Sequence, residues 1–144
     1  MAELFAQTLG PVSGHVIGDG THSGSYEVYA DSGTAARRIL SLGSPQMDIG
    51  AMAVRSVVTG VEEVVGDGGA MAAVLMRAVY QAANRRISAG VDAMGMVREL
   101  HEAAAAAADI VAAHAVCAKT EDKLAVLARS VVNDPDLAAM LGEM

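Results

Sequence analysis

The residues of this chain best suited to bind a ligand are Gly66-Asp67-Gly68, which precede an apolar run over 71–83. A Gly-Asp-Gly turn at the start of a helix places free backbone N–H groups beside a carboxylate. The N–H groups and the helix dipole attract a phosphate, glycine permits its close approach, and a carboxylate can hold Mg²⁺. The same triplet is also an ordinary turn before a helix, so its surroundings must decide between the two interpretations.

Other reactive side chains give weaker predictions. His15, Asp19 and His22 lie around a Gly-rich loop, but their spacing does not match a metal site, and we interpret them as turn residues. Cys117 follows His114 by three residues, a spacing open to a Cys–His nucleophile pair. A cysteine in an apolar segment is more often inert packing. We therefore predict no catalytic residue.

Two adjacent carboxylates, Glu62 and Glu63, form no convincing acid–base pair. We expect them to lie on a solvated helix face. We also expect His101 and Glu102, which follow each other in the sequence, to lie on a solvated helix face.

The composition favours a helical protein. The 144 residues are enough for one domain over 1–144 that buries roughly 70% of its unfolded surface. Hydrophobic residues make up 53% of the chain and aromatic residues only 3%. Small and unbranched apolar side chains favour close helix–helix packing over a β-sandwich.

Charge and cysteine content exclude several classes. The net charge is −7 and the ten basic residues are dispersed, so we expect no nucleic-acid partner. No uncharged apolar stretch is long enough to cross a membrane, and the first residues lack the basic region of a secretory signal. The single cysteine rules out an internal disulfide, and we expect a cytoplasmic protein.

The elements that must position the turn follow from hydrophobic periodicity and from glycine and proline breaks. A short helix is predicted over 1–9 and a β-hairpin over about 14–30. Further helices are predicted over about 34–42, 47–65, 69–89, 93–114, 120–132 and 135–142. The prediction is a mainly α fold with one small hairpin.

The middle helices carry apolar residues on most sides. In the helix over 69–89, Met71, Val74, Leu75, Val79 and Ile87 do not fit one stripe. A helix that is hydrophobic all round is buried by several neighbours. In so short a chain, this favours a homo-oligomer or an obligate partner.

The order of motifs resembles the ATP-binding equatorial domain of the GroEL-like chaperonins. That family has Gly-Asp-Gly-Thr-Thr-Thr before a helix, and this chain continues from Gly66-Asp67-Gly68 with Gly69, Ala70 and Met71. Downstream, Ser88-Ala89-Gly90, Ala93-Met94 and an Ala-rich stretch over 97–111 resemble the family's next turn, helix start and helix.

Upstream, Thr8-Leu9-Gly10-Pro11 is similar to the family's phosphate loop, and Asp31-Ser32-Gly33 stands where the family has Lys-Asp-Gly. The residues from Val116-Cys117 to the end resemble the family's entry into its intermediate domain. The resemblance therefore covers nearly the whole chain and implies an equatorial-domain-like helical bundle with one hairpin.

The resemblance also implies a nucleotide site. Asp67 would hold Mg²⁺, and Gly66, Gly68, Gly69 and Ala70 would approach the phosphates of ATP. The other side of the nucleotide would be closed by Thr8, Leu9, Gly10 and Pro11. A chain of this kind would act as a homo-oligomer or beside a partner chaperonin subunit.

Several departures weaken that site. The three hydroxyl side chains that follow Gly-Asp-Gly in the family are absent, at roughly 0.5–1.5 kcal/mol for each lost hydrogen bond. The basic residues after Thr-Leu-Gly-Pro are absent, and the aspartate of Lys-Asp-Gly is Ser32. Asp31 stands one place early, and on a strand one place reverses the side-chain direction.

Two hypotheses remain open. The first is a chaperonin-related protein with a degenerate ATP and Mg²⁺ motif, which assists protein folding with other subunits. Because parts of the family's catalytic machinery are absent, we expect weak or absent ATP binding and no independent ATPase activity. The second is a non-enzymatic oligomeric structural or interaction module that has lost ATP binding.

Overall fold

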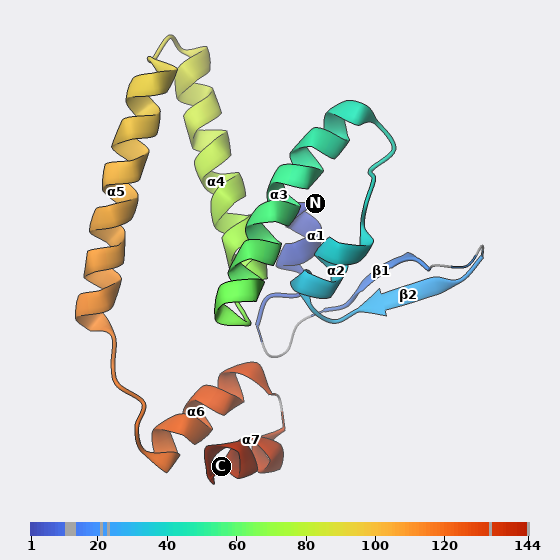
Figure 1. Cartoon of the computed structure of the whole chain (residues 1–144), viewed down its shortest axis with the longest axis vertical. Helices are drawn as coiled ribbons and strands as arrows, with labels where there is room; N and C mark the ends of the chain where they lie inside the picture. The colour runs from blue at the N-terminus through green and yellow to red at the C-terminus, as the bar shows by residue number, and fades with distance from the viewer. Residues whose placement is uncertain (11–13, 21, 23, 133, 144) are drawn as a thin grey trace. The chain divides into compact units, whose positions relative to one another are not determined.

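The computed structural model describes residues 1–10, 14–20, 22, 24–132 and 134–143 (Figure 1). The chain divides into two compact units, Met1–Ala78 and Val79–Met144, here called the N-terminal and C-terminal units. The described part contains seven helices and one two-stranded antiparallel sheet. The predicted mainly α fold with a single hairpin is therefore confirmed.

The N-terminal unit is built from short helices, a hairpin and one long helix. Its elements are α1 (Ala2–Ala6), β1 (Val16–Asp19), β2 (Tyr26–Tyr29), α2 (Ser32–Arg38), α3 (Pro45–Val65) and the first half of α4 (Gly69–Ser88). In the hairpin, Val16 pairs with Tyr29 and Ile17 with Val28. The first pair is buried and the second exposed, as the alternation of a strand requires.

Side-chain caps fix where the helices begin. Asp31 accepts a hydrogen bond from the Thr34 amide at 2.6 Å and caps α2. Ser44 accepts one from the Met47 amide at 3.3 Å and caps α3, and Pro45 follows in the first turn. The last turn of α3 ends at Gly66, whose amide donates to the Glu62 carbonyl at 2.9 Å.

The core of this unit lies where α1, the hairpin, α2, α3 and α4 meet. Phe5 and Val58 are its largest fully buried side chains. The other buried members are mostly small: Ala2, Val16, Tyr29, Ala35, Ala36 and Ala73. Small side chains let the helix backbones approach closely. Arg77 of α4 also pairs with Glu3 of α1 at 2.5 Å.

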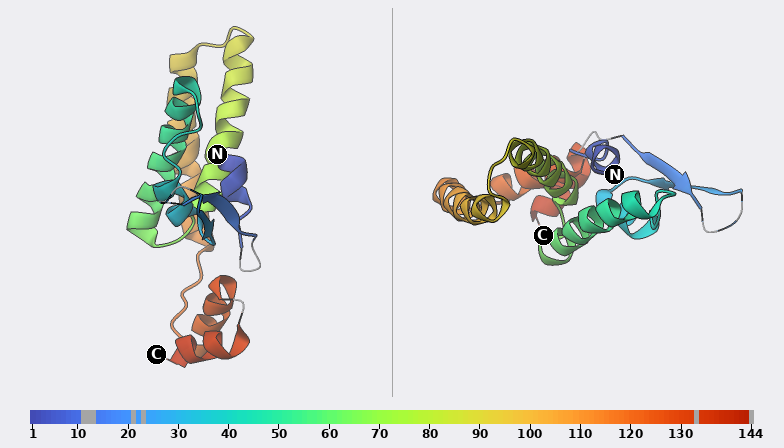
Figure 2. Two further views of the ribbon diagram at one scale, coloured as in Figure 1. Left: turned by 90° about the vertical axis from the view of Figure 1, so that its right-hand side faces the viewer. Right: turned by 90° about the horizontal axis from the view of Figure 1, so that it is seen from above.

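The C-terminal unit contains the second half of α4, then α5 (Ala93–His114), α6 (Glu121–Val131) and α7 (Pro135–Glu143). Asp92 caps α5 by accepting hydrogen bonds from the Met94 and Gly95 amides. Figures 1 and 2 show α5 returning antiparallel beside the end of α4. A β-carbon on Gly142 of α7 would lie 2.9 Å from the Ala125 β-carbon of α6, so these two helices pack closely.

The predicted elements agree with the structure except near the N-terminus. The hairpin lies inside 14–30, and the five helices from 47 onward begin and end within two residues of the prediction. The helix predicted over 1–9 ends at Ala6. One domain over 1–144 stays a prediction.

The helix predicted over 34–42 is wrong at its C-terminal end. Because Asp31 caps it, α2 starts two residues earlier, and it ends at Arg38. The carbonyl of Ala36 accepts a hydrogen bond from Arg55 Nε at 2.8 Å, and the Leu42 amide donates to Asp48 Oδ1 at 2.6 Å. These bonds to α3 hold the following segment outside a helix. The placement of Asp31 on a strand is also wrong, because β2 ends at Tyr29.

Candidate functional site

The Gly66-Asp67-Gly68 turn connects α3 to α4. Gly66 and Gly68 have φ of 82° and 91°, a left-handed conformation that favours glycine at both positions. Asp67 is exposed, and its Oδ1 accepts a hydrogen bond from the Gly68 amide at 2.6 Å. The carboxylate predicted to hold Mg²⁺ is therefore open to solvent and also braces its own turn.

The start of α4 is less accessible than the turn before it. Gly66 and Asp67 are exposed, whereas Gly69 and Ala70 are buried. The first α-helical bond of this turn runs from the Ala72 amide to the Gly68 carbonyl at 2.9 Å. The amides of Gly69 and Ala70 precede it, so they lack acceptors within the helix. These donors suit an anion, but their residues are packed against the protein.

The packing around Gly69 explains one departure from the family pattern. A β-carbon there would lie 2.6 Å from Glu62 Oε1, 2.8 Å from Ser32 Oγ and 2.9 Å from Val58 Cγ1. All three distances are shorter than ordinary van der Waals contacts. The threonine of the chaperonin motif would not fit here without moving the fully buried Val58.

The second segment predicted to contact phosphate, Thr8 to Pro11, begins just after the end of α1. The Thr8 hydroxyl is buried and donates to the Phe5 carbonyl at 2.8 Å. Leu9 and Gly10 are exposed, and Gly10 has φ of 87°. Pro11 lies outside the described residues. The Thr8 hydroxyl thus has a structural partner.

The structure does not join the two predicted segments by a direct bond. Within 1–10 and 66–70, no hydrogen bond or ion pair runs from one segment to the other. The part of the chain that is described contains no group of three or more His, Cys, Asp or Glu placed to hold a metal ion. Binding of ATP and Mg²⁺ at these residues stays a prediction.

Sequence reasoning missed Glu62. The expectation of a solvated side chain is wrong for this residue, because it is half-buried and accepts a hydrogen bond from Ser32 Oγ at 3.2 Å. Glu63 is exposed as predicted. A contact between residues thirty positions apart leaves no trace in periodicity, so the sequence held no signal for it.

The Cys–His hypothesis gains no geometric support. Cys117 is exposed. The Nδ1 atom of His114 lies 2.8 Å from the Ile110 carbonyl oxygen, one turn earlier in α5. This ring nitrogen is engaged with the helix backbone, as expected for a residue near a helix end.

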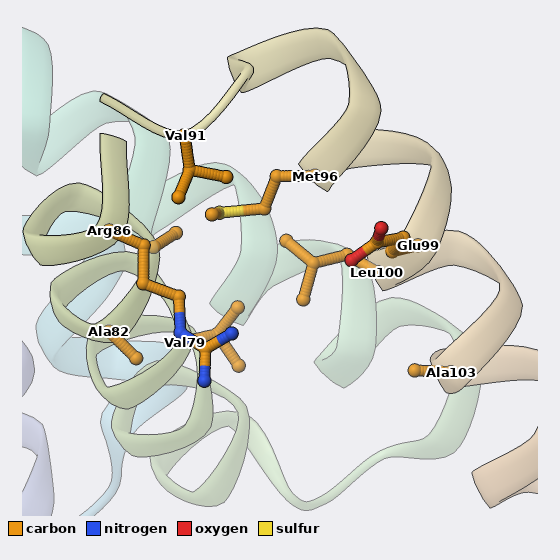
Figure 3. A pocket seen from close by; sticks show the side chains of 9 residues that line it. Val79, Ala82, Arg86, Val91, Met96, Glu99, Leu100 and Ala103 are labelled. Carbon is orange, nitrogen blue, oxygen red and sulfur yellow. The ribbon is translucent and has the colours of Figure 1, made fainter. Parts of the chain in front are cut away.

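A separate cavity of about 340 Å³ lies in the C-terminal unit between the end of α4 and the start of α5 (Figure 3). Its lining is mostly apolar and consists of Val79, Ala82, Ala83, Arg86, Val91, Met96, Glu99, Leu100 and Ala103. Arg86 and Glu99 are the charged residues of this lining, which contains no hydroxyl or thiol side chain. The cavity suits an apolar side chain better than a reaction.

This mainly α chain is related to the GroEL-like chaperonins, as its similarity to curated proteins shows. Over 143 residues it is 29% identical to chaperonin GroEL 1 of Mycobacterium ulcerans (strain Agy99), 28% to that of Mycobacterium leprae (strain TN) and 31% to that of Mycobacterium bovis (strain BCG / Pasteur 1173P2). Each alignment covers 99% of this chain and 26% of the relative. The chain thus spans about a quarter of the length of these relatives. No family model matches it.

Among the described residues, no helix is both long and apolar enough to cross a bilayer.

Proposed function

We propose that this chain is a chaperonin-related subunit that works within an oligomer, beside copies of itself or a partner chaperonin subunit. In this proposal Gly66-Asp67-Gly68 binds Mg²⁺ and ATP weakly or not at all, and the assembly assists protein folding. A single cysteine and no internal disulfide suit the cytoplasm, where we place it.

The observation that carries the proposal is the exposure of large apolar side chains on consecutive helices. Ile110 and Val111 of α5 are 62% and 70% exposed. Helices α4 and α5 together also expose Met71, Leu75, Val79, Tyr80, Ile87, Met94, Val97 and Leu100. Burial of one such side chain stabilises by about 1.5–3 kcal/mol, so a partner covering several of them would gain substantial free energy.

The geometry of the turn supports weak nucleotide binding. Asp67 is open to a metal ion, but one of its oxygens already bonds to Gly68. Gly69 and Ala70 offer amides without side-chain hydroxyls, and both residues are buried. An independent ATPase is not part of the proposal.

A second candidate is a purely structural module that has lost nucleotide binding. The exposed hairpin pair Ile17 and Val28 favours it, because a two-stranded sheet leaves edges open to strand addition. Deleting residues 18–24 should weaken assembly if the hairpin pairs with a neighbour, and leave it unchanged otherwise.

Light scattering tests the assembly. We expect a mass that is a multiple of 14.7 kDa, or formation of a complex with a partner chaperonin subunit. Replacing Ile110 and Val111 with serine should lower the assembled mass. The control replaces Ala105 and Ala106 of the same helix, which are exposed but carry no large apolar side chain, with serine and should leave the assembled mass unchanged. A wild-type monomer at all concentrations would contradict the homo-oligomer.

Isothermal titration with Mg-ATP tests the turn. We expect a dissociation constant of about 1 mM or weaker, which corresponds to a binding free energy of no more than about 4 kcal/mol. The Asp67→Asn variant should lose this binding. Asp109→Asn, a change of the same charge on exposed α5, is the control. Micromolar binding would contradict the weak-site proposal and restore a working nucleotide site.

A further inference from the structure

The cavity between the end of α4 and the start of α5 carries one charge on each wall. Arg86 comes from α4 and Glu99 from α5, and both residues are exposed (Figure 3). Among the described residues, neither side chain forms an ion pair or a hydrogen bond. The rest of the lining is apolar. An occupant that fits both features has an exposed apolar side chain with an acidic residue on one side and a basic residue on the other.

Helix α6 presents that combination on one face. Asp122, Val126 and Arg129 are spaced i, i+4 and i+7, so they lie on the same side of the helix. Val126 is 67% exposed, both charged residues are exposed, and α6 has no buried residue. Within the part of the chain that the structure describes, the side chains of Asp122 and Arg129 have no ion-pair or hydrogen-bond partner. Both charges are therefore available to a neighbour.

Helix α3 carries the same spacing in Asp48, Met52 and Arg55, but its charges are already engaged. Asp48 Oδ1 accepts a hydrogen bond from the Leu42 amide at 2.6 Å, and Arg55 Nε donates to the Ala36 carbonyl at 2.8 Å. Docking through this face would break bonds that hold α2 and α3 together. The comparison favours α6 as the occupant.

The chain's own α6 is poorly placed to fill the cavity. Glu99 precedes His114, the last residue of α5, by fifteen residues, which is about 22 Å along the helix. The segment 115–120 joins α5 to α6 and spans at most about 20–22 Å when fully extended. The lining contains no residue of α6 or α7. An α6 from another copy reaches the cavity without this stretching.

We propose that α6 of a second copy of this chain docks in the α4–α5 cavity. Val126 enters the apolar space, Asp122 pairs with Arg86, and Arg129 pairs with Glu99. The exchange is reciprocal, so each contact occurs twice in a symmetric pair of chains. The inference rests on the proposed function, in which the chain assembles, and names the two surfaces that meet.

Charge reversal tests the pairing. Arg86→Glu places a like charge opposite Asp122, and Asp122→Arg places one opposite Arg86. The double variant Arg86→Glu/Asp122→Arg restores an opposite pair with its sides exchanged. Arg85→Glu is the matched control, because Arg85 is the preceding residue, is exposed and does not line the cavity. Self-association of the full chain is measured by sedimentation equilibrium over a concentration series, and circular dichroism compares the helix content of the variants.

We expect each single reversal to raise the dissociation constant of the self-associated chain by about tenfold or more, because the altered pair occurs twice. The double variant should return to within about threefold of the wild type. Arg85→Glu should match the wild type. Val126→Asp, which brings a charge into the apolar space, should also weaken association.

Three results would overturn the inference. If the wild type associates and Arg86→Glu associates equally well, or if the double variant is not restored, α6 does not dock as described while the assembly proposal stands. If the wild type is monomeric at every concentration, the homo-oligomer fails as well. If the double variant restores the thermal stability of a monomer without any change of mass, the chain's own α6 fills the cavity.

Discussion

The two units of this protein differ in how completely they bury their large apolar side chains. The N-terminal unit encloses Phe5 and Val58 completely. In the C-terminal unit, the largest buried hydrophobic side chain among the described residues is Met96, at 8% exposure. Most of the large apolar residues of α5 and α6 remain exposed.

This difference indicates where each unit obtains its stability. Helices in water depend on tertiary packing of an apolar face more than on intrinsic propensity. The N-terminal unit supplies that packing from its own hairpin and helices. The C-terminal unit supplies little of it, and in the proposed assembly a partner would cover the exposed apolar side chains of its helices.

The largest effect is expected from emptying the N-terminal core. Phe5→Ala removes a fully buried ring and should cost about 3–5 kcal/mol of unfolding free energy, measured by urea denaturation. Leu4→Ala, on the same helix and 41% exposed, is the control and should cost no more than about 1 kcal/mol. Equal losses for the two variants would contradict the burial of Phe5 in a packed core of the N-terminal unit.

A smaller effect is expected from adding one carbon at the start of α4. Gly69→Ala places a β-carbon against buried Val58 and should cost about 1–3 kcal/mol in the same assay. Val58→Ala should couple to it in a double-mutant cycle.

Gly60→Ala is the matched glycine control, since nothing lies within 4 Å of a β-carbon there. This exposed position within α3 should gain about 0.5–1 kcal/mol from better helix propensity. A Gly69→Ala variant as stable as Gly60→Ala would show that α2, α3 and α4 do not pack as described.

The smallest effect concerns the buried phenol of the hairpin. Burial raises the pKa of Tyr29 above 10.0, with Glu27 adding to the rise, and its hydroxyl donates to the Asp19 carbonyl at 3.4 Å. The folded state therefore prefers the protonated phenol, so its contribution is present below the unfolded pKa and is lost as pH rises through the folded value.

An alkaline titration of stability checks this sign. The wild type should lose stability above about pH 10, and Tyr29→Phe should lose less, because it has no phenol to ionise. Identical alkaline profiles would show that Tyr29 is not held in the core of the N-terminal unit.

Much of the fold was accessible from the sequence because its signals are local. Gly and Pro breaks and the 3.6-residue period placed five helices, and a Gly-rich loop between β-branched and aromatic residues placed the hairpin. The end of α2 was not accessible, because bonds from Arg55 and Asp48 of α3 decide it.

Part of the candidate site could likewise be predicted from local sequence, and part depends on packing between helices. The left-handed glycines around Asp67 and the start of α4 follow from the residue types themselves. The insertion of Glu62 between Gly33 and Gly69 depends on how three helices meet, which no spacing along the chain encodes. The substitution of glycine for threonine at position 69 gains a reason only from that packing.

Hydrogen exchange tests the central contrast most directly. The chain is diluted until light scattering gives 14.7 kDa, and amide exchange is followed along its length. We predict slow exchange in α3 around Val58 and in the first half of α4, and fast exchange throughout α5 and α6. Protection of α5 equal to that of α3 in the monomer would contradict the account, because the C-terminal unit would then be stable without a partner.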